Sequence, residues 1–564
     1  MEKKFKRRVV EYASPATVFL RYAVAVYLFL FFVIYPFYYE NKFYNMGEAK
    51  WHFFRGMTFY FRPAFLRGLA LPSILELAIA FLIWRIIELA VKKELKEKFQ
   101  LAKISLLDKC VFVYGLLVVV SALLSPFKLN VIAQEDLSLA SSNNIFMGYS
   151  GWHMGIFAQL AFVMLYFLVS RYWEYDNMWT SVYLGVSGVV YFLALLHQFR
   201  IDPLNMFDGQ PINLPSDIYF LSTIGQSSWY SSYLCCLFPV GLYIFWHSEK
   251  KNIRIASGIY SIVSFASMVT QSSDSAIFAL VAIFVTLLFF SYMENRLFVR
   301  FFECVILTVA TFVGVGILQK IAPENAVDAG EIWKFMSQNP VMWVLLVLMI
   351  VIRVLLGKAY AQEKLEVRKF KFIWYVVIAL MIIGAVGAVV YIYLNTTGKL
   401  PENLRSDNMY LLWNAYWGNW RGADWTCTVL AFLDCLKDQP LVGLFGTGSD
   451  MMWRMAYKYR ADIVNQVDQQ TKMVCAHNEW LNAFPNQGLL GGIAYIAIFI
   501  SAIKRFGSKA KETPELVAIV LCVTTYMAHN FYCYQQIIVT PMIFILMGMG
   551  EKIAVNGMGD NETK

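Results

Sequence analysis

The feature that most constrains this fold is a series of apolar runs that recurs along the whole chain. Each run is about 17–25 residues long, which is the length a helix needs to cross the hydrocarbon core of a bilayer. A helix also satisfies its own backbone polar groups, as lipid requires. The runs lie at 17–39, 69–91, 110–128, 153–170, 179–197, 227–246, 256–270, 275–293, 303–319, 340–357, 373–395, 485–503, 515–530 and 536–550. We therefore predict an all-α polytopic membrane protein with about 14 transmembrane helices.

The composition agrees with a membrane protein. Of 564 residues, 59% are hydrophobic and only 15% are charged, whereas a soluble protein carries about 25% charged residues. A single soluble core also stops growing beyond roughly 250–300 residues, so this apolar excess needs lipid as its solvent. The net charge of +9 fits basic loops at an anionic membrane surface. No nucleic-acid-binding motif is present, and we predict no nucleic acid partner.

The distribution of lysine and arginine predicts the orientation in the cell membrane. Basic residues gather in the N-terminus and in the loops 92–109, 247–255, 353–372 and 504–512, which we place in the cytoplasm. An even number of spans then puts both termini in the cytoplasm. The basic N-terminus followed by an apolar run resembles a signal peptide. The run is long enough to span, however, and no small-residue cleavage site follows it, so we interpret it as an uncleaved first helix.

Three regions follow from this topology. Residues 1–395 hold the first eleven predicted spans, 396–484 form one large extracytoplasmic loop, and 485–564 hold the last spans and a cytoplasmic tail. Apolar residues recur near helical spacing in the large loop at Trp417, Trp420, Trp425, Val429, Phe432 and Leu436. They predict an amphipathic helix that ends before Pro440, with tryptophans suited to the membrane–water interface.

The cysteines predict no metal site. Five of the nine fall in apolar runs, while Cys427, Cys435, Cys475 and Cys533 fall in or beside outer segments. None has the spacing of metal ligands. A disulfide among the four outer cysteines stays open as an alternative.

A histidine near the end of the large loop is the first candidate for chemistry. His477 and Asn478 stand just before a predicted span that contains Gly488, Gly491 and Gly492. A histidine there can titrate near neutral pH and act as a general base on a hydroxyl group. The glycines allow close helix packing. The alternative is an interfacial histidine that only caps the loop.

Arg421 is the second candidate. Arginine is the residue best suited to a pair of phosphate oxygens. Alternatively, Arg421 pairs with an aspartate or reaches the headgroup region from an interfacial helix. Arg454, Lys458 and Arg460 could also meet an anion, or they form a solvated charge cluster.

Two short polar stretches lie at the same predicted outer boundary. The turn Thr270–Ser275 contains Asp274, which is either a helix cap or a functional carboxylate. The stretch Gly225–Tyr233 contains Ser228, which serves either helix packing or contacts to sugar hydroxyls. His529 with Asn530 repeats the His-Asn pair at another outer boundary and is a weaker candidate. Four separated stretches thus converge on the outer face.

The string AHNEWLNAFPNQGLLGGIAYIAIFI, beginning at Ala476, resembles the signature of the O-antigen ligase and O-antigen polymerase superfamily. The segment Asn419–Trp425, followed by Gln439–Gly443 and Gly446–Gly448, is similar to the family's Arg–x–x–x–Trp … Pro–x–x–Gly–x–Gly pattern. Thr223–Tyr230 and Ser273–Ala276 resemble two further family stretches. The resemblance covers roughly 220–500, and the order of its elements is more specific than any one of them.

This sequence departs from the family pattern at two positions. Asp274 stands where many relatives have an arginine that contacts the lipid-linked pyrophosphate, and Ser228 stands where asparagine is usual. Either another cation replaces that arginine or this branch recognises a different donor. The candidate cations are Arg405, Arg454, Lys458 and Arg460.

The resemblance implies a GT-C-type membrane glycosyltransferase that uses neither a metal nor a nucleotide. The implied partners are a polyprenyl-pyrophosphate-linked glycan donor, a glycan acceptor and the lipid bilayer, with a chain-length regulator or a flippase as a further candidate. His477 would accept a proton from the acceptor hydroxyl, and Arg421 would stabilise the pyrophosphate as it leaves. Trp425 would line or anchor the site. Asn478 and Ser228 would contact substrate, and Asp274 would bind sugar hydroxyls or orient His477.

The expected activity is the polymerisation of lipid-linked oligosaccharide repeats into a surface polysaccharide. A ligase that moves the finished glycan to another acceptor is the close alternative. A transporter or flippase of lipid-linked sugars is an alternative of a different class, and it predicts ionisable residues near the bilayer midplane and repeat symmetry. The sequence shows neither feature, because ionisable residues within the spans lie near their ends. A purely structural membrane protein is the third alternative.

Overall fold

The computed structural model describes residues 14–42, 45–60, 72–91, 104–127, 144–207, 222–271, 273–327, 330–467 and 473–561. Across these residues the chain is all-helical, and the only β structure is an isolated bridge between Asn144 and Gly148. Eight helices are long and apolar enough to cross a membrane by length and composition. The all-helical class and the series of long apolar helices expected of a multi-pass membrane protein are therefore confirmed.

Each predicted apolar interval coincides with a helix. These helices are α1 (Pro15–Phe29, continued by η1, Leu30–Ile34, and η2, Tyr35–Phe37), α3 (Ile74–Val91), α4 (Leu106–Leu124), α6 (Ile156–Tyr172), α7 (Asn177–Gln198), α8 (Ser227–His247), α9 (Lys251–Thr270), α10 (Ser275–Ser291), α11 (Asn295–Ile321), α13 (Val341–Ala361), α14 (Phe372–Thr396), α19 (Glu479–Lys509), α20 (Leu516–His529) and α21 (Thr540–Asn561). Much of the predicted N-terminal segment and of the loops 92–109, 129–152 and 198–218 lies outside the described residues.

Shorter helices fill the connections. Within the bundle these are α2 (Met46–Phe59), α12 (Glu331–Gln338) and η5 (Val367–Phe370), while η6 (Glu402–Leu404) lies in the 396–484 loop. Some helix starts carry side-chain caps: the Ser14 hydroxyl accepts from the Thr17 amide at 3.3 Å ahead of α1. Ser105 and Asp108 form a reciprocal capping box at the start of α4.

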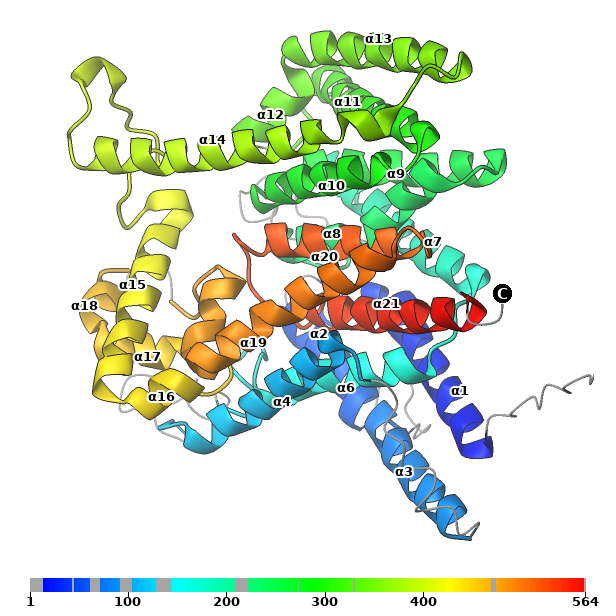
Figure 1. Ribbon diagram of the computed structural model, residues 1–564. Helices are drawn as coiled ribbons and strands as arrows, with labels where there is room; N and C mark the ends of the chain where they lie inside the picture. The colour runs from blue at the N-terminus through cyan, green and yellow to red at the C-terminus, as the bar shows by residue number, and fades with distance from the viewer. Residues whose placement is uncertain are drawn as a thin grey trace, which may run out of the picture.

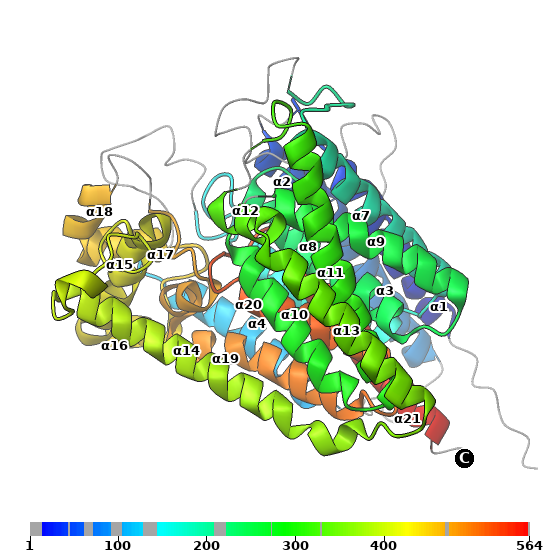
Figure 2. The same cartoon turned by 90° about the horizontal axis from the view of Figure 1, so that it is seen from above.

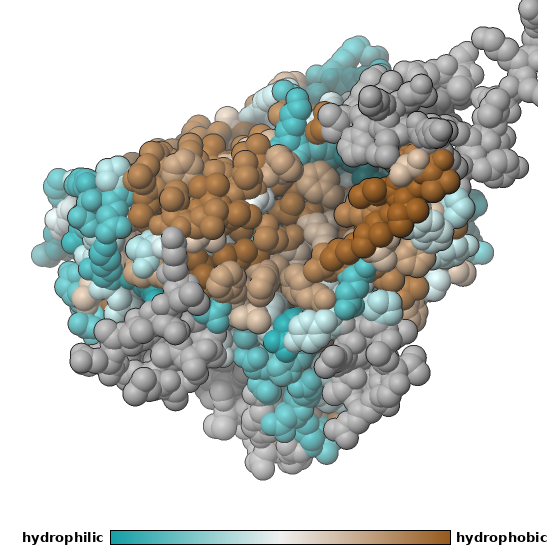
Figure 3. Space-filling model, turned by 90° about the horizontal axis from the view of Figure 1, so that it is seen from below, coloured by the Kyte–Doolittle hydropathy of each residue, from teal (hydrophilic) through white to brown (hydrophobic). Residues whose placement is uncertain are grey.

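The long helices run side by side, with α8, α20 and α21 among those at the centre (Figure 1). Nearly every residue of α20 is buried. In contrast, only 6% of the most apolar window of α13 is buried, and 0% of that of α14. Figure 3 shows broad apolar areas on the side of α3, bordered by hydrophilic residues. Such large exposed apolar areas are typical of a surface that faces lipid.

Besides η6, the described part of the large predicted loop contains four α-helices: α15 (Trp417–Asp438), α16 (Pro440–Phe445), α17 (Met452–Tyr459) and α18 (Ala461–Val467). They gather at one end of the bundle, and α14 reaches across to them (Figures 1 and 2). The predicted helix that ends before Pro440 is confirmed, because α15 ends at Asp438. Its apolar stripe is not continuous, however, since the backbone at Gly418, Asn419 and Trp420 is left-handed.

The glycine-rich stretch after α16 attaches this end to the bundle. Gly446 and Gly488 both have positive φ, and a Cβ on Gly446 would lie 2.5 Å from the Gly488 nitrogen. The Gly448 amide donates to the Asn486 carbonyl at 2.9 Å. The Asn486 side chain accepts from the Met451 amide at 2.9 Å. These bonds hold the loop against α19 at Gly488, where the helix is kinked.

Candidate functional site

His477 forms a hydrogen-bonded pair with an aspartate from α15. Its Nδ1 lies 2.8 Å from Oδ2 of Asp424. Asp424 is almost fully buried, whereas 31% of the His477 side chain is exposed. Asp424 occupies Nδ1 and so leaves Nε2 as the nitrogen that can meet a ligand, and the Cys475 side chain also interacts with this ring. The backbone at His477 is left-handed, with φ +45°. Strain of this kind costs of order 1–3 kcal/mol and is concentrated at functional sites.

The surroundings change the acid–base behaviour of His477. Burial lowers its pKa, but the Cys475 side chain and the Asp424 carboxylate raise the pKa by more, to about 10. Both neighbours therefore favour the protonated imidazole. It carries a positive charge that an anion can meet, and it accepts a proton only after releasing its own.

Arg421 lies one helical turn before Asp424 on α15. Its Nη1 donates to the Gly418 carbonyl at 2.7 Å and its Nη2 to the Tyr532 carbonyl at 2.9 Å. The guanidinium lies 5.0 Å from the centre of the Tyr532 ring. Among the described residues no carboxylate lies within 4 Å of the Arg421 guanidinium, and the nearby Asp424 is paired with His477. Arg421 thus carries an uncompensated charge beside the His477–Asp424 pair.

A tight turn gives Arg421 this position. Gly418, Asn419 and Trp420 all have φ between 57° and 70°, which costs a residue with a side chain roughly 1–2 kcal/mol. Directly after the turn, the chain passes so close to itself that a Cβ on Gly422 would lie 1.9 Å from the Asn414 carbonyl oxygen. A glycine is therefore required at position 422.

The segment 529–536, between α20 and α21, connects the separated stretches. Its Tyr532 carbonyl holds Arg421. The Tyr534 ring lies edge-on to His477, with centroids 5.2 Å apart. Trp152 packs on the same two rings, 4.1 Å from Tyr534 and 6.2 Å from His477. The segment therefore runs between the cation and the histidine, and of its residues sequence reasoning identified only His529 and Asn530.

The stretch around Ser228 reaches the site through the same segment. The Trp229 indole donates to the Tyr534 hydroxyl at 3.1 Å. The Ser228 carbonyl lies 3.9 Å from the Cys533 sulfur. The charge of Arg421 lowers the pKa of this thiol, although burial has the larger effect and raises it to about 12. Ser228 thus lies at the edge of the site, half-buried.

Asp274 is joined to the site by a tyrosine from the large loop. Its carboxylate accepts a short hydrogen bond from the Tyr410 hydroxyl. Burial and this carboxylate raise the pKa of Tyr410, and the charge of Arg421 opposes the shift. Asp274 was expected either to bind sugar hydroxyls or to orient His477. The structure gives the second role to Asp424.

The other cations proposed to replace the missing arginine lie elsewhere. Arg405 is exposed and donates to the Gly398 and Leu400 carbonyls. Lys458 and Arg460 pair with Asp438 and Asp434. Because Asp434 follows Asp424 by ten helical residues, it lies about 15 Å further along α15. The Arg454 guanidinium packs against Phe127 and Trp453, and its Nε has no partner among the described residues. Arg421 is thus the arginine beside His477.

Aromatic rings cover one side of the site. The Trp425 ring lies 5.2 Å from that of Trp417 and 5.5 Å from that of Tyr532. Its indole N–H is buried and has no acceptor among the described residues. Asn478, by contrast, is 2% exposed. Its side chain caps α19 by accepting from the Leu481 amide at 3.0 Å. Trp425 therefore has a donor to offer to a ligand, whereas the Asn478 oxygen is already used.

The second Ala-His-Asn sequence forms a buried polar network behind the site. Nε2 of His529 lies 2.8 Å from the Ser231 hydroxyl and 2.9 Å from that of Ser275. Its Nδ1 lies 2.8 Å from the side-chain oxygen of Asn530. Asn530 in turn donates to the Glu479 carboxylate. Ser231 and Ser275 come from two of the stretches that the sequence singled out, so both stretches meet at this histidine.

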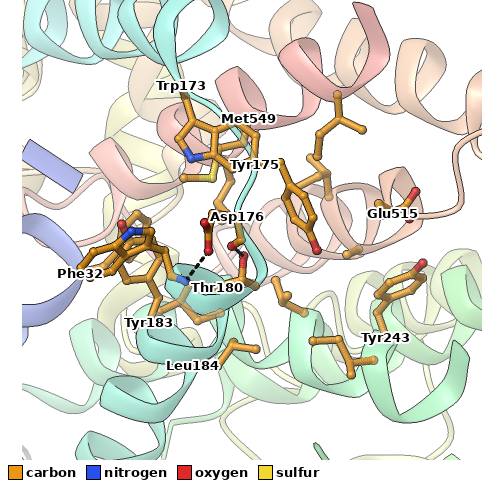
Figure 4. Close-up of a pocket in the computed structure, with 18 residues that line it drawn as sticks. Phe32, Trp173, Tyr175, Asp176, Thr180, Tyr183, Leu184, Tyr243, Glu515 and Met549 are labelled. Atoms are coloured by element: carbon orange, nitrogen blue, oxygen red, sulfur yellow. Dashed lines mark hydrogen bonds between the residues drawn. The ribbon is translucent and has the colours of Figure 1, made fainter. Parts of the chain in front are cut away.

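The cysteines and a separate cavity do not add to the site. All nine cysteines are free, so the open alternative of a disulfide is not realised. An aromatic cavity of about 120 Å³ lies between α7, α8, α20 and α21 and includes Trp173, Asp176 and Glu515 (Figure 4). Glu515 precedes α20, whose other end carries His529. The cavity is therefore about 20 Å from the His477 end.

Comparison with known proteins adds no relative. No protein-family model matches the chain, and no curated protein matches it.

Proposed function

We propose that this chain is a membrane glycosyltransferase that polymerises polyprenyl-pyrophosphate-linked oligosaccharide repeats on the extracytoplasmic side. The observation that carries the proposal is the pair His477–Asp424 beside Arg421, an arginine without a carboxylate partner. A base next to an unpaired cation suits a reaction in which a hydroxyl loses a proton while a phosphate leaves.

In the proposed reaction, Nε2 of His477 accepts the proton of the acceptor hydroxyl. The hydroxyl oxygen forms a bond to the anomeric carbon of the donor, and the bond from that carbon to the pyrophosphate oxygen breaks with inversion. The electron pair leaves with the pyrophosphate, and Arg421 stabilises the charge that develops there. Asp424 holds the imidazole through Nδ1 and stabilises the imidazolium that forms.

The raised pKa of His477 allows a second role, which the pH dependence distinguishes. If His477 is the base, the rate rises with pH as the imidazole loses its proton near pH 10. If the imidazolium instead binds the pyrophosphate in place of the family's arginine, the rate falls over the same range. We favour the base, because Arg421 already supplies an unpaired cation next to the pair.

The aromatic side of the site supports a sugar substrate. Trp425, Trp417 and Tyr532 present broad apolar faces together with polar groups, a combination that matches a sugar ring. The unpartnered Trp425 indole N–H can donate to a sugar hydroxyl. Asp274, bound to Tyr410, adds a carboxylate at the same edge.

The test is a reconstituted assay with purified protein, liposomes and lipid-linked repeats, read out as polymer length. We expect polymer from the unaltered protein and none from His477→Ala or Arg421→Ala. His247→Ala, at the end of α8 far from Ser228, and Arg368→Ala, at an exposed position, are controls away from the site and should polymerise normally. Full-length polymer from His477→Ala or Arg421→Ala would remove that residue from the mechanism.

The acceptor separates the polymerase from the ligase, because both use the same chemistry. Adding a second, chemically different acceptor to the same assay makes this comparison direct. Transfer only to the second acceptor would replace the polymerase with the ligase. The absence of any transfer from lipid-linked sugar by well-folded protein would contradict both.

A further inference from the structure

A basic groove lies at the other end of the bundle from His477. It is a space of about 530 Å³ between α9, α11 and α13. The cations that line it are Arg254, Arg296, Arg300, Arg353 and Lys358, and among the described residues Glu303 is the only carboxylate that lines it. The groove is next to the turn between α8 and α9, whereas Ser228, which lies at the His477 site, is at the start of α8. The 21 residues of α8 separate the two ends by about 30 Å.

The single carboxylate in the groove is shared. Glu303 lies 2.5 Å from Nη2 of Arg254 and 2.7 Å from Nη2 of Arg353. One negative charge thus faces two positive charges, and the triad stays positive. The triad of Arg254, Glu303 and Arg353 also connects α9, α11 and α13, so the ion pairs themselves hold these three side chains in position.

Two further cations in the groove have no carboxylate within 4 Å among the described residues. Nη1 of Arg300 donates to the carbonyls of Trp246, His247 and Ser248, the shortest bond being 2.6 Å. The remaining N–H groups of Arg300 have no partner there. Lys358 is exposed, and its amino group has no hydrogen-bond or ion-pair partner in the part of the chain that the structure describes. Only Arg296, at the rim, is balanced, by Glu249 and Glu294.

The wall beside the groove is apolar. Val347, Val351 and Val354 of α13 are 58%, 48% and 42% exposed. They follow one another at helical spacing, and Val354 lines the groove. A lipid whose phosphate enters the groove could therefore lay its acyl chains along α13. A soluble phosphate compound would make no use of this wall.

We infer that this groove binds the headgroup of an anionic phospholipid from the leaflet opposite the His477 site. The loops next to the groove, 247–255 and 353–372, are those predicted to be cytoplasmic. Basic pockets between helices at that side match anionic headgroups, and each lysine or arginine near the surface contributes to the attraction. The inference does not depend on the proposed glycosyl transfer.

The test measures lipid retention by native mass spectrometry of the purified full-length protein. Phosphatidylglycerol is titrated in parallel with phosphatidylcholine, and inorganic phosphate is titrated in a third arm. We expect one phosphatidylglycerol retained in preference to phosphatidylcholine. The double variant Arg300→Gln/Lys358→Gln, which leaves the Glu303 triad intact, should bind phosphatidylglycerol about thirtyfold more weakly.

Lys364→Gln is the control, because Lys364 is exposed near the same end of α13 but does not line the groove. It should retain phosphatidylglycerol as the unaltered protein does. Raising the salt concentration should release phosphatidylglycerol from the unaltered protein, a result that does not depend on the folding of any variant. Equal retention of both lipids, unchanged retention by the double variant, or displacement of the lipid by millimolar phosphate would overturn the inference.

Discussion

His477 and His529 stand in the same tripeptide, Ala-His-Asn, and lie at the same end of the bundle, yet their surroundings differ. His477 has a carboxylate, Asp424, at Nδ1, which leaves Nε2 available to a ligand, and 31% of its side chain is exposed. His529 is fully buried. Its Nδ1 can donate to Asn530 and its Nε2 can accept from the hydroxyls of Ser231 and Ser275.

The difference shows that a neighbouring charge and access, rather than the local sequence, separate a reactive histidine from a structural one. A ring that exchanges protons with a ligand needs a free nitrogen and a group that stabilises its charge. His477 has both. Both nitrogens of His529 are used by neutral partners, which suit an uncharged ring in the interior.

The largest expected effect is on the reaction rate. If this effect were not observed, the distinction between a reactive His477 and a structural His529 would be wrong. We expect His477→Gln to lower kcat by about 10²–10⁴, the usual contribution of a general acid or base. His529→Gln keeps a polar side chain in the network and should lower kcat far less. Initial rates in the reconstituted assay, normalised to folded protein, provide the measurement. Equal losses in the two variants would mean that the histidines act together.

The second prediction concerns the carboxylate that distinguishes the two histidines. Cys475 and Asp424 together raise the pKa of His477 to about 10. Asp424→Asn removes the second of these contributions, so the apparent pKa should fall by about one to three units. If His477 is the base, the rising limb of kcat/KM against pH moves to lower pH by the same amount, while the maximal rate also falls. The profile from pH 6 to 11 measures this shift.

Asp434→Asn is the matched control for this shift. Asp434 lies on the same helix and pairs with Arg460 instead of a histidine. Its profile should coincide with that of the unaltered protein. An Asp424→Asn profile with no displacement would show that the aspartate does not set the ionisation of His477.

The third prediction concerns the free energy of unfolding, for which substitution of His529 should have a larger effect than substitution of His477. His529→Ala leaves the buried Asn530 side-chain oxygen without its partner and removes one hydrogen bond from each of the Ser231 and Ser275 hydroxyls, which keep their bonds to Ser273. Each buried group left unsatisfied costs about 1–3 kcal/mol, so the free energy of unfolding should fall by at least that amount. His477→Ala should leave it nearly unchanged. Unfolding in mixed micelles, followed by tryptophan fluorescence, measures both. Equal stability of the two variants would contradict the structural role of His529.

The helices could be predicted from the sequence because the length and polarity of an apolar run are local properties. Their ends were less predictable. The start of α19 at Glu479, six residues before the predicted run at 485, depends on a buried bond from the Glu479 amide to the Asn530 carbonyl. The left-handed turn at Gly418–Trp420 interrupts a stripe of residues whose spacing predicts a continuous helix. Contacts distant in sequence decide both features.

The candidate site was predictable only where residue chemistry is distinctive. His477 and Arg421 carry side chains that few structural roles require, and both lie near sequence motifs. Asp424 was not singled out, because its role depends on meeting a histidine 53 residues later. The segment 529–536 was missed apart from His529 and Asn530. In this segment Tyr532 contributes a backbone carbonyl and Tyr534 contributes a ring packed on His477. No sequence motif predicts either contact.

The smallest expected effect concerns Tyr410, which links Asp274 to the site. Tyr410→Phe removes the hydrogen bond to the Asp274 carboxylate but keeps the ring. Because both groups are only half-buried, water replaces much of the bond, and the KM for the lipid-linked donor should rise only about two- to fivefold with kcat unchanged. Tyr416→Phe is the control, since its hydroxyl makes no hydrogen bond among the described residues. A fall in kcat as large as that of His477→Gln would place Tyr410 in the chemistry, and histidine environment alone would no longer explain where the reaction occurs.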